Sequence, residues 1–216
     1  MRVRLKAHRR GFTLMEFMVV AAVLAILVVI FLPRLNRPPR SPRINCLNNL
    51  KMVGLSFRLW ALDDGENFPM QVSLTNGGTM ELAGSGDVYP HFLVMSNELN
   101  TPKVLFCQAD QKRKPATAFT PSPANSNISY FVGLDANEST PQMLRSGDDC
   151  LTVGGKPVKP GLLLLSTNAT VAWTKARHNR QGNVGLAGGS VISVDTSGLQ
   201  RALFNSSVAT NRLAMP

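Results

Sequence analysis

One apolar run near the start of the chain dominates the hydrophobic pattern. Residues 12–32 read FTLMEFMVVAAVLAILVVIFL, and Glu16 carries the only charged side chain in this run. A helix rises about 1.5 Å per residue, so the run would form a helix about 30 Å long, which matches the hydrocarbon core of a bilayer. The run exceeds the apolar region of a cleaved secretory signal, about 7 to 15 residues, and no small-x-small pattern follows it. The pattern therefore predicts a retained transmembrane helix over 12–32.

A second helical pattern follows, with apolar positions at three- and four-residue spacing. Ser41 and Asn45 are both suitable N-caps, and Asp63-Asp64-Gly65 provides a stop, so a helix that packs on a sheet is predicted between them. The acidic residues at its end, including Glu66, lack the spacing of a calcium-binding EF-hand loop and indicate a solvated turn. The positions expected to face the sheet are Leu47, Leu50, Gly54, Phe57 and Ala61, with Met52, Leu55, Leu59 and Leu62 widening the buried stripe.

Downstream of Phe68 the pattern is typical of short strands joined by turns. One hairpin is predicted around Asn76-Gly77-Gly78 and another around Gly188-Gly189, because glycine pairs allow the backbone of a tight turn. Strands are predicted over 71–74, 80–83, 128–132, 162–166, 170–173, 183–187 and 191–195.

The remaining segments predict loops and short helices. Residues 89–95 fit either a strand or a short helix, and residues 115–127 are rich in Pro, Ala, Thr, Ser and Asn, which favours a loop. Ser197 is predicted to cap a short helix over 198–205, followed by a loose tail. A mixture of one long helix with antiparallel hairpins indicates an α+β domain.

A proline- and arginine-rich segment separates the two helical patterns. Residues 33–43 contain four prolines and four arginines, and the first of them, Pro33, is predicted to end or kink the first helix because it lacks an amide proton. The segment is interpreted as a semi-extended linker. The predicted domain organisation is a basic leader over 1–11, a transmembrane helix over 12–32, the linker, and a globular head over 44–216.

The positive charge of the chain flanks the apolar run. The formal net charge is +10, but five of the 23 cations lie in the first ten residues and four more lie in 33–43. Without the first eleven residues, 18 cations remain against 13 acids. This distribution argues against a nucleic-acid partner. It favours a cytoplasmic N-terminus and a head on the far side of the membrane.

The residues around the start of the apolar run, RRGFTLME over 9–16, closely resemble the processing site of type IV prepilins and type II secretion pseudopilins. The resemblance implies cleavage between Gly11 and Phe12 by a prepilin peptidase, followed by N-methylation of Phe12. It implies that Glu16 neutralises the new amine of a neighbouring subunit in a filament. The implied partners are the peptidase and N-methyltransferase, other pilin-like subunits that contact the N-terminal helix, and an inner-membrane assembly platform.

The resemblance extends into the head, which it implies to be pilin-like, with one helix packed on an antiparallel sheet. The segments CLNNLK over 46–51, NFPM over 67–70, SYFVG over 129–133 and the last eight residues are similar to pseudopilin-like proteins of planctomycete and verrucomicrobial type. Those proteins carry a signature of His, nine residues, then Asp-Gly. Here His178 is followed by nine residues and Gly188-Gly189, so the Asp is missing. Any role that this Asp carboxylate has in the related proteins therefore does not carry over to this chain.

The cysteines and histidines offer little catalytic chemistry. Cys46, Cys107 and Cys150 lack the CxxC spacing of zinc sites. On the oxidising side of a membrane one disulfide between Cys46 and Cys107 is plausible, and three reduced thiols are the alternative. His91 and His178 have no nucleophile or carboxylate at motif spacing, and the chain has no GxSxG, HExxH or P-loop. We therefore expect no enzyme, no cofactor and no metal.

Two functions remain open on the sequence alone. The first is a structural subunit of an envelope filament, either of a type II secretion system or of a type IV pilus, anchored by a single pass in the inner membrane with its head on the periplasmic side. The second is a membrane-anchored binding or adhesion protein that keeps the signal without polymerising. The proline-rich break after residue 32 supports the second, because pilin-like proteins usually continue one long helix into the head.

Overall fold

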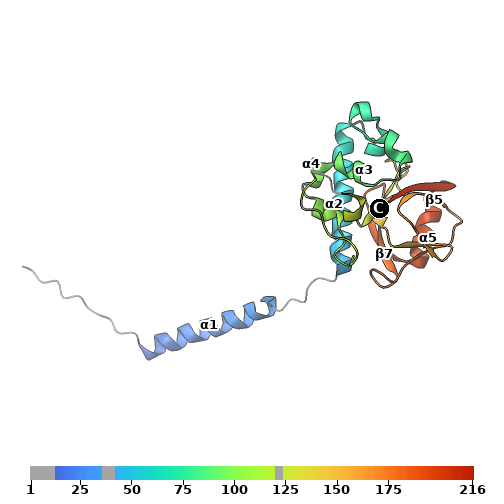
Figure 1. Cartoon of the computed structure of the whole chain (residues 1–216). Coiled ribbons are helices and arrows are strands. Elements are labelled where there is room, and N and C mark those ends of the chain that lie inside the picture. Colours follow the sequence, from blue (N-terminus) through green and yellow to red (C-terminus); the bar gives the residue numbers. More distant parts are fainter. Residues whose placement is uncertain (1–12, 36–41, 120–123) are drawn as a thin grey trace, which may run out of the picture. The chain divides into compact units, whose positions relative to one another are not determined.

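A computed structural model describes residues 13–35, 42–119 and 124–216 of the protein. The chain divides into two compact units, Met1–Arg40 and Ser41–Pro216, and each is described by itself. The predicted α+β class is confirmed, because helices occur together with antiparallel sheets (Figure 1).

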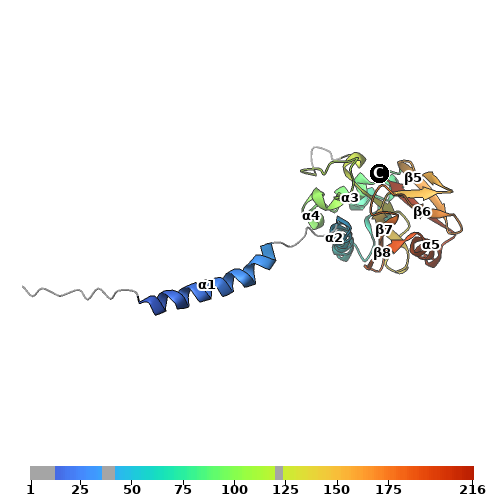
Figure 2. The ribbon, with the colours of Figure 1, turned by 90° about the horizontal axis from the view of Figure 1, so that it is seen from below.

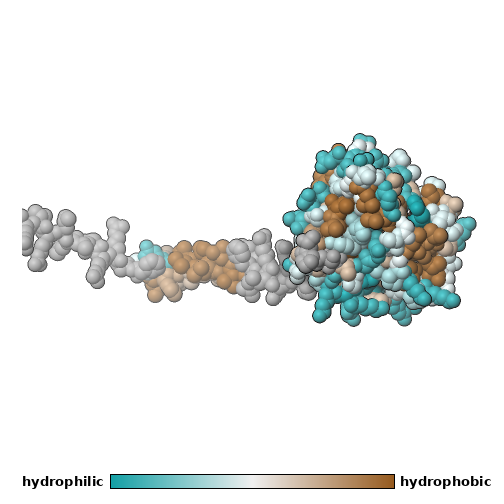
Figure 3. Space-filling model, turned by 45° about the horizontal axis from the view of Figure 1, so that its top comes forward, coloured by the Kyte–Doolittle hydropathy of each residue, from teal (hydrophilic) through white to brown (hydrophobic). Residues whose placement is uncertain are grey.

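The first unit contains helix α1, Leu14–Leu35. Its side chains are exposed and mostly apolar along the described stretch 13–28 (Figure 3). Pro33 was predicted to end or kink the helix. The helix continues through Pro33 to Leu35, so an end at Pro33 is wrong by two residues. Proline removes one amide donor, but its fixed φ is close to the helical value, so the backbone can stay helical for two more residues. Within the described residues, no helix combines the length and the apolar character needed to cross a bilayer.

The second unit opens with helix α2, Pro42–Asp63. The helix starts inside the predicted linker, because proline in the first turn lacks only an amide proton that would be unbonded there anyway. Of the predicted linker 33–43, residues 33–35 belong to α1, and residues 36–41 lie outside the described residues. The head therefore begins at least two residues before the predicted boundary.

Helix α2 buries one face against strands β2 (Leu144–Asp148), β7 (Gln181–Leu186) and β8 (Val191–Asp195). It also packs against the segment that contains helix α4, Ser96–Leu99 (Figure 2). Leu50, Phe57 and Ala61 are buried on this face, as the spacing predicts, and so is Gly54. Leu47 is only half-buried, and Val53, which the spacing did not single out, is fully buried. The prediction that the buried stripe is wider is wrong, because four apolar side chains lie on the outer side of the helix. Their exposed fractions are 49% for Met52, 50% for Leu55, 42% for Leu59 and 72% for Leu62.

The segment after α2 contains short helices in place of the hairpin predicted over 71–74 and 80–83. Ser73 accepts a hydrogen bond from the Thr75 amide, and the Glu81 carboxylate accepts from Ser73 Oγ at 2.6 Å and from the Leu74 amide at 2.8 Å. These side-chain bonds satisfy the backbone locally, so no strand pairing is needed. The short helices are η1 Pro69–Gln71, η2 Leu74–Asn76, η3 Met80–Gly84, α3 Tyr89–Leu93, α4 Ser96–Leu99, η4 Pro102–Leu105 and η5 Asn125–Asn127.

Two antiparallel sheets form the rest of the head. The larger has the strand order β5-β9-β1-β2-β7-β8, and the smaller has the order β4-β3-β6. The strands predicted near 128–132, 162–166, 170–173, 183–187 and 191–195 are confirmed to within two residues as β1, β5, β6, β7 and β8. The strand bounds are β1 Tyr130–Gly133, β2 Leu144–Asp148, β3 Leu151–Val153, β4 Lys156–Pro157, β5 Gly161–Ser166, β6 Val171–Trp173, β7 Gln181–Leu186, β8 Val191–Asp195 and β9 Thr210–Met215.

The C-terminal segment corrects two predictions. The tail expected to be loose is strand β9, which pairs with β5 on one side and β1 on the other. Helix α5, Thr196–Asn205, is capped by Asp195 and not by Ser197, because the Asp195 carboxylate accepts from the Gly198 amide at 2.8 Å. The β7–β8 hairpin is confirmed, and Gly189 supplies the positive φ of its turn, at 93°.

Two large hydrophobic cores lie on opposite faces of the larger sheet. The first joins α2 and the short helices to residues such as Val132 on β1. The second joins the smaller sheet and α5 to residues such as Phe131, the neighbour of Val132 that points the other way. A small third core contains Cys46, Cys107 and Tyr130 and positions the site described next.

Candidate functional site

The first candidate site is the start of α1, where Thr13 and Glu16 form a reciprocal cap. The Glu16 carboxylate accepts hydrogen bonds from the Thr13 amide at 2.8 Å and from Thr13 Oγ1 at 2.9 Å. Thr13 Oγ1 in turn accepts from the Glu16 amide at 3.3 Å. This is a capping box, which satisfies amide groups that the first turn of a helix leaves unbonded. The carboxylate is thereby held at the positive end of the helix dipole.

The predicted processing residues lie next to this cap. Gly11 and Phe12 are outside the described residues, so cleavage between them and methylation of Phe12 stay predictions. Thr13 is the next residue, and its amide already contacts Glu16. Cleavage after Gly11 would create an amine on Phe12, the residue that precedes Thr13, and opposite charges attract.

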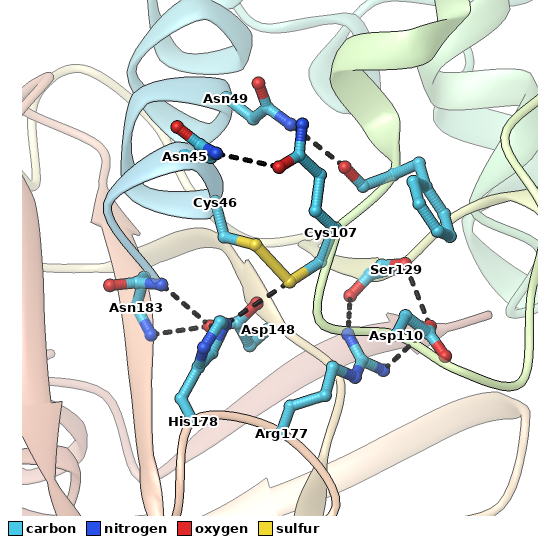
Figure 4. Close-up of a disulfide and its surroundings, with 12 residues drawn as sticks. Asn45, Cys46, Asn49, Cys107, Asp110, Ser129, Asp148, Arg177, His178 and Asn183 are labelled. Carbon is cyan, nitrogen blue, oxygen red and sulfur yellow. Dashed lines mark hydrogen bonds and ion pairs between the residues drawn. A yellow bond between two sulfur atoms is a disulfide. The ribbon is translucent and has the colours of Figure 1, made fainter. Parts of the chain in front are cut away.

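The second candidate site lies in the head, around a disulfide between Cys46 and Cys107. The structure joins the first turns of α2 to the loop after η4, with a Cα–Cα distance of 5.1 Å (Figure 4). Beside it, Asn45 Nδ2 donates to Gln108 Oε1 at 2.7 Å, and Asn49 Nδ2 donates to the Phe106 carbonyl at 2.9 Å. The sequence left this pairing open against three free thiols, and Cys150 is the cysteine that remains free and buried.

His178 lies directly against the disulfide, and Asp148 lies next to His178. His178 Nε2 is 3.2 Å from Cys107 Sγ and 3.8 Å from Asp148 Oδ2 (Figure 4). Burial, with Arg177 adding to it, lowers the pKa of His178 to about 4, so the ring is neutral at pH 7. Burial raises the pKa of the Asp148 carboxyl to about 7, although Asn183 donates to Oδ2 from its amide at 2.8 Å and from Nδ2 at 3.0 Å.

A network of two arginines and two aspartates continues from this point. Arg177 forms ion pairs with Asp149 and with Asp110, the latter at 3.3 Å. Arg113 contacts the same two carboxylates, Asp149 at 2.6 Å and Asp110 at 3.1 Å. Burial opposes the charge of Asp110, but Arg177 and the hydrogen bonds outweigh it and hold the pKa of Asp110 below its usual value. The network is buried and locally neutral, so it orders the loops that carry it.

A cavity of about 630 Å³ opens beside the network. Lys112 and Lys159 line it together with apolar residues that include Val158 and Met215. Cys150 also lines it, and burial raises the pKa of this thiol to about 12, so it is protonated and a poor nucleophile at pH 7. The cavity is of the size that holds small ligands.

The structure separates the two parts of the C-terminal signature remnant. His178 precedes β7 and contacts the disulfide, whereas Gly188 and Gly189 follow the far end of β7. An added Cβ on Gly188 would lie 2.8 Å from Pro141 Cβ, so this position excludes larger residues. The glycine pair therefore serves the hairpin turn, and the histidine serves the disulfide region.

Sequence reasoning missed the polar residues that surround His178. Asp148, Arg177 and Asn183 come from different strands and loops, and no spacing motif relates them. The only sequence signals were adjacency: Arg177 precedes His178, and Asp148-Asp149 precedes Cys150.

Comparison with known proteins bears on the first site. Residues 6–32 match the family model described as the prokaryotic N-terminal methylation motif. The chain carries a prepilin-type signal. This signal is the substrate sequence of a prepilin peptidase, and it is typical of membrane-anchored proteins. The match ends before α2 and does not extend to the head. No curated protein and no solved structure matches the chain.

Proposed function

We propose that the protein is a structural subunit of a type II secretion or type IV pilus-like envelope filament and not an enzyme. The precursor is anchored by a single pass in the inner membrane, cleaved after Gly11, methylated at Phe12 and delivered to an assembly platform with its head on the periplasmic side. The single observation that carries the proposal is the position of the Glu16 carboxylate, held by Thr13 at the start of an exposed apolar helix inside a prepilin-type signal.

The energetics of this carboxylate favour a partner. A lone charge on an apolar helix is costly in a membrane, whereas a paired one is tolerated. Pairing with the Phe12 amine of a neighbouring subunit offsets part of the cost of removing the carboxylate from water. The contribution recurs at each subunit of a filament and disfavours misregistered helices. Glu16 thereby acts as a register device.

The outer face of α2 also supports assembly. Met52, Leu55, Leu59 and Leu62 recur at steps of three, four and three residues, the spacing of a helix-pairing seam. All four are exposed, and the buried face of the same helix is already occupied by the sheet. A head with such a seam presents a second apolar surface to other helices.

One observation favours the alternative of a membrane-anchored binding protein that does not polymerise. The cavity beside the network of Arg113, Arg177, Asp110 and Asp149 has the volume of a small-ligand site. A filament subunit does not require it. The two functions differ in whether the chain forms multimers in the envelope.

Crosslinking of the membrane fraction in cells that also express a prepilin peptidase tests the proposal. The parent protein should form a ladder of multimers, and Glu16→Val should lose it while remaining membrane-bound and cleaved. Glu16→Gln is the matched control for the helix cap, since glutamine preserves a capping box but carries no charge. We expect the yield of crosslinked multimers to fall in Glu16→Gln as well, by about tenfold or more. A parent-like ladder in Glu16→Gln would show that the charge does not direct assembly.

A further inference from the structure

Three metal-binding side chains from distant parts of the head meet at the disulfide. Cys46 comes from α2, Cys107 from the loop after η4, and His178 from the loop before β7. Their ligand atoms all lie within 4.8 Å of one another. Both cysteines are fully buried, and the His178 side chain is 2% exposed. Sequence spacing does not reveal this set, because Cys46 and Cys107 are 61 residues apart and Cys107 and His178 are 71 residues apart.

The chemistry of this set is that of a zinc site. Two thiolates and a neutral imidazole are preferred Zn²⁺ ligands, at about 2.3 Å from sulfur and 2.0 to 2.1 Å from nitrogen, in tetrahedral geometry. The sulfurs of a disulfide are bonded to each other and are not thiolates, so they do not provide these ligands. The same residues therefore provide a covalent bond in the oxidised state and a three-ligand set in the reduced state.

Asp148 supplies an independent sign of a missing partner. The residue is fully buried, and its Oδ1 has no hydrogen-bond partner among the described residues. Its Oδ2 accepts two hydrogen bonds from Asn183 and lies 3.8 Å from His178 Nε2. A buried carboxylate oxygen without a partner is costly, and a bound cation would satisfy it.

The surroundings suit a divalent cation in charge as well as in ligand type. Two thiolates and one carboxylate carry three negative charges, so a bound Zn²⁺ leaves one. Asn183 orients Asp148 in the way that outer hydrogen bonds orient metal ligands.

We propose that the reduced head binds one Zn²⁺ through Cys46, Cys107 and His178, with Asp148 as the fourth ligand, and that the disulfide is the metal-free state of the same site. A dithiol reductant transfers two electrons and two protons to the Cys46–Cys107 bond and becomes a disulfide itself. Zn²⁺ then displaces the two thiol protons. Oxidation of the two thiolates by a disulfide reverses the sequence and releases the ion.

Zinc titration of the full chain in detergent tests the site. The oxidised protein should bind no zinc at this site, and protein reduced with a phosphine should bind one Zn²⁺ per chain, measured with a chromophoric zinc indicator. Co²⁺ in place of Zn²⁺ should give the absorption of a tetrahedral thiolate complex. Circular dichroism reports the fold in each state. Reduced protein that takes up no stoichiometric zinc, or that unfolds and is not refolded by zinc, would overturn the proposal.

Variants separate this site from adventitious thiol binding. His178→Ala retains both cysteines and can be purified as the folded disulfide form before reduction. We expect its zinc affinity to fall by at least about tenfold, since even outer-shell changes cost 10- to 100-fold. Cys150→Ser is the matched control and should bind zinc like the parent. Unchanged affinity in His178→Ala would refute the three-ligand set, and unchanged affinity in Asp148→Asn would refute the fourth ligand.

Discussion

At the scale of single residues, the Cys46–Cys107 bond anchors the start of α2 to the loop after η4. The two cysteines are 61 positions apart, and the bond closes a loop that contains most of α2 and the short helices from η1 to η4. The bond therefore fixes a segment in which the structure describes helices and no strands. Closing so long a loop removes much of the freedom of the unfolded chain.

Removing this bond should destabilise the head strongly. We expect replacement of both Cys46 and Cys107 by Ala to lower the free energy of unfolding by about 4 kcal/mol, on the chain-entropy account of a loop of this length. Denaturant titration under non-reducing conditions measures it. Cys150→Ala is the control and should cost about 1 kcal/mol, as a typical buried substitution does. Equal losses in the two proteins would show that the bond does not constrain the chain.

The residue scale also shows where sequence reasoning stops. Glu16 and Gly11 were found because one local motif holds them, and the motif match supports that local signal. The pair Cys46–Cys107 could be named but not chosen from the sequence, because pairing depends on which loops the fold brings together. Asp148 and Asn183 could not be found at all, because strand pairing between β2 and β7 creates their contact.

At the scale of elements, side-chain hydrogen bonds decided several starts and ends that hydrophobic spacing left ambiguous. The hairpin predicted after Phe68 has alternating apolar positions, yet Ser73 and Glu81 bond the backbone there and favour turns. Strand β9 was missed because its sequence, TNRLAM, has little β-branched or aromatic character. Its strand conformation comes from pairing with β5 and β1, which is a tertiary effect.

The start of α5 gives a direct test of capping. The Asp195 carboxylate accepts hydrogen bonds from the Gly198 amide at 2.8 Å and from Ser197 Oγ at 2.9 Å. Asp195→Ala should therefore lower the free energy of unfolding by about 1 kcal/mol, measured by denaturant titration. Ser197→Ala removes only the hydrogen bond from Ser197 Oγ to Asp195. Its free energy of unfolding should lie within about 0.5 kcal/mol of that of the parent. A larger loss in Ser197→Ala than in Asp195→Ala would contradict the assignment of the cap.

At the scale of the whole molecule, burial of neutral polar groups links the stability of the head to pH. His91 is fully buried, and its Nδ1 is 2.7 Å from Thr79 Oγ1. Burial lowers the pKa of His91 to about 4, although the nearby charge of Asp87 raises it slightly. The unfolded chain binds a proton at this ring below about pH 6.5, whereas the folded head does so only near pH 4. Stability is therefore lost as the pH falls from 6.5 towards 4.

His91→Gln should flatten this pH dependence. Between pH 7 and pH 5 the free energy of unfolding of the parent should fall by about 2 kcal/mol more than that of the variant, from the linkage of a single group. His178 and Asp148 titrate in both proteins, so their contributions cancel in the comparison. Denaturant titrations at the two pH values measure the difference. Parallel pH dependences would mean that His91 is not held neutral by the fold.

The N-terminus of the membrane-extracted protein tests most directly whether the chain is a prepilin-type precursor. Mass spectrometry of protein from a host with an active prepilin peptidase should show a chain that begins at Phe12 and carries one methyl group. Gly11→Val, which places a side chain in the cleavage subsite, should accumulate as the full-length precursor. Parent protein that retains Met1 through Gly11 in that host would contradict the account.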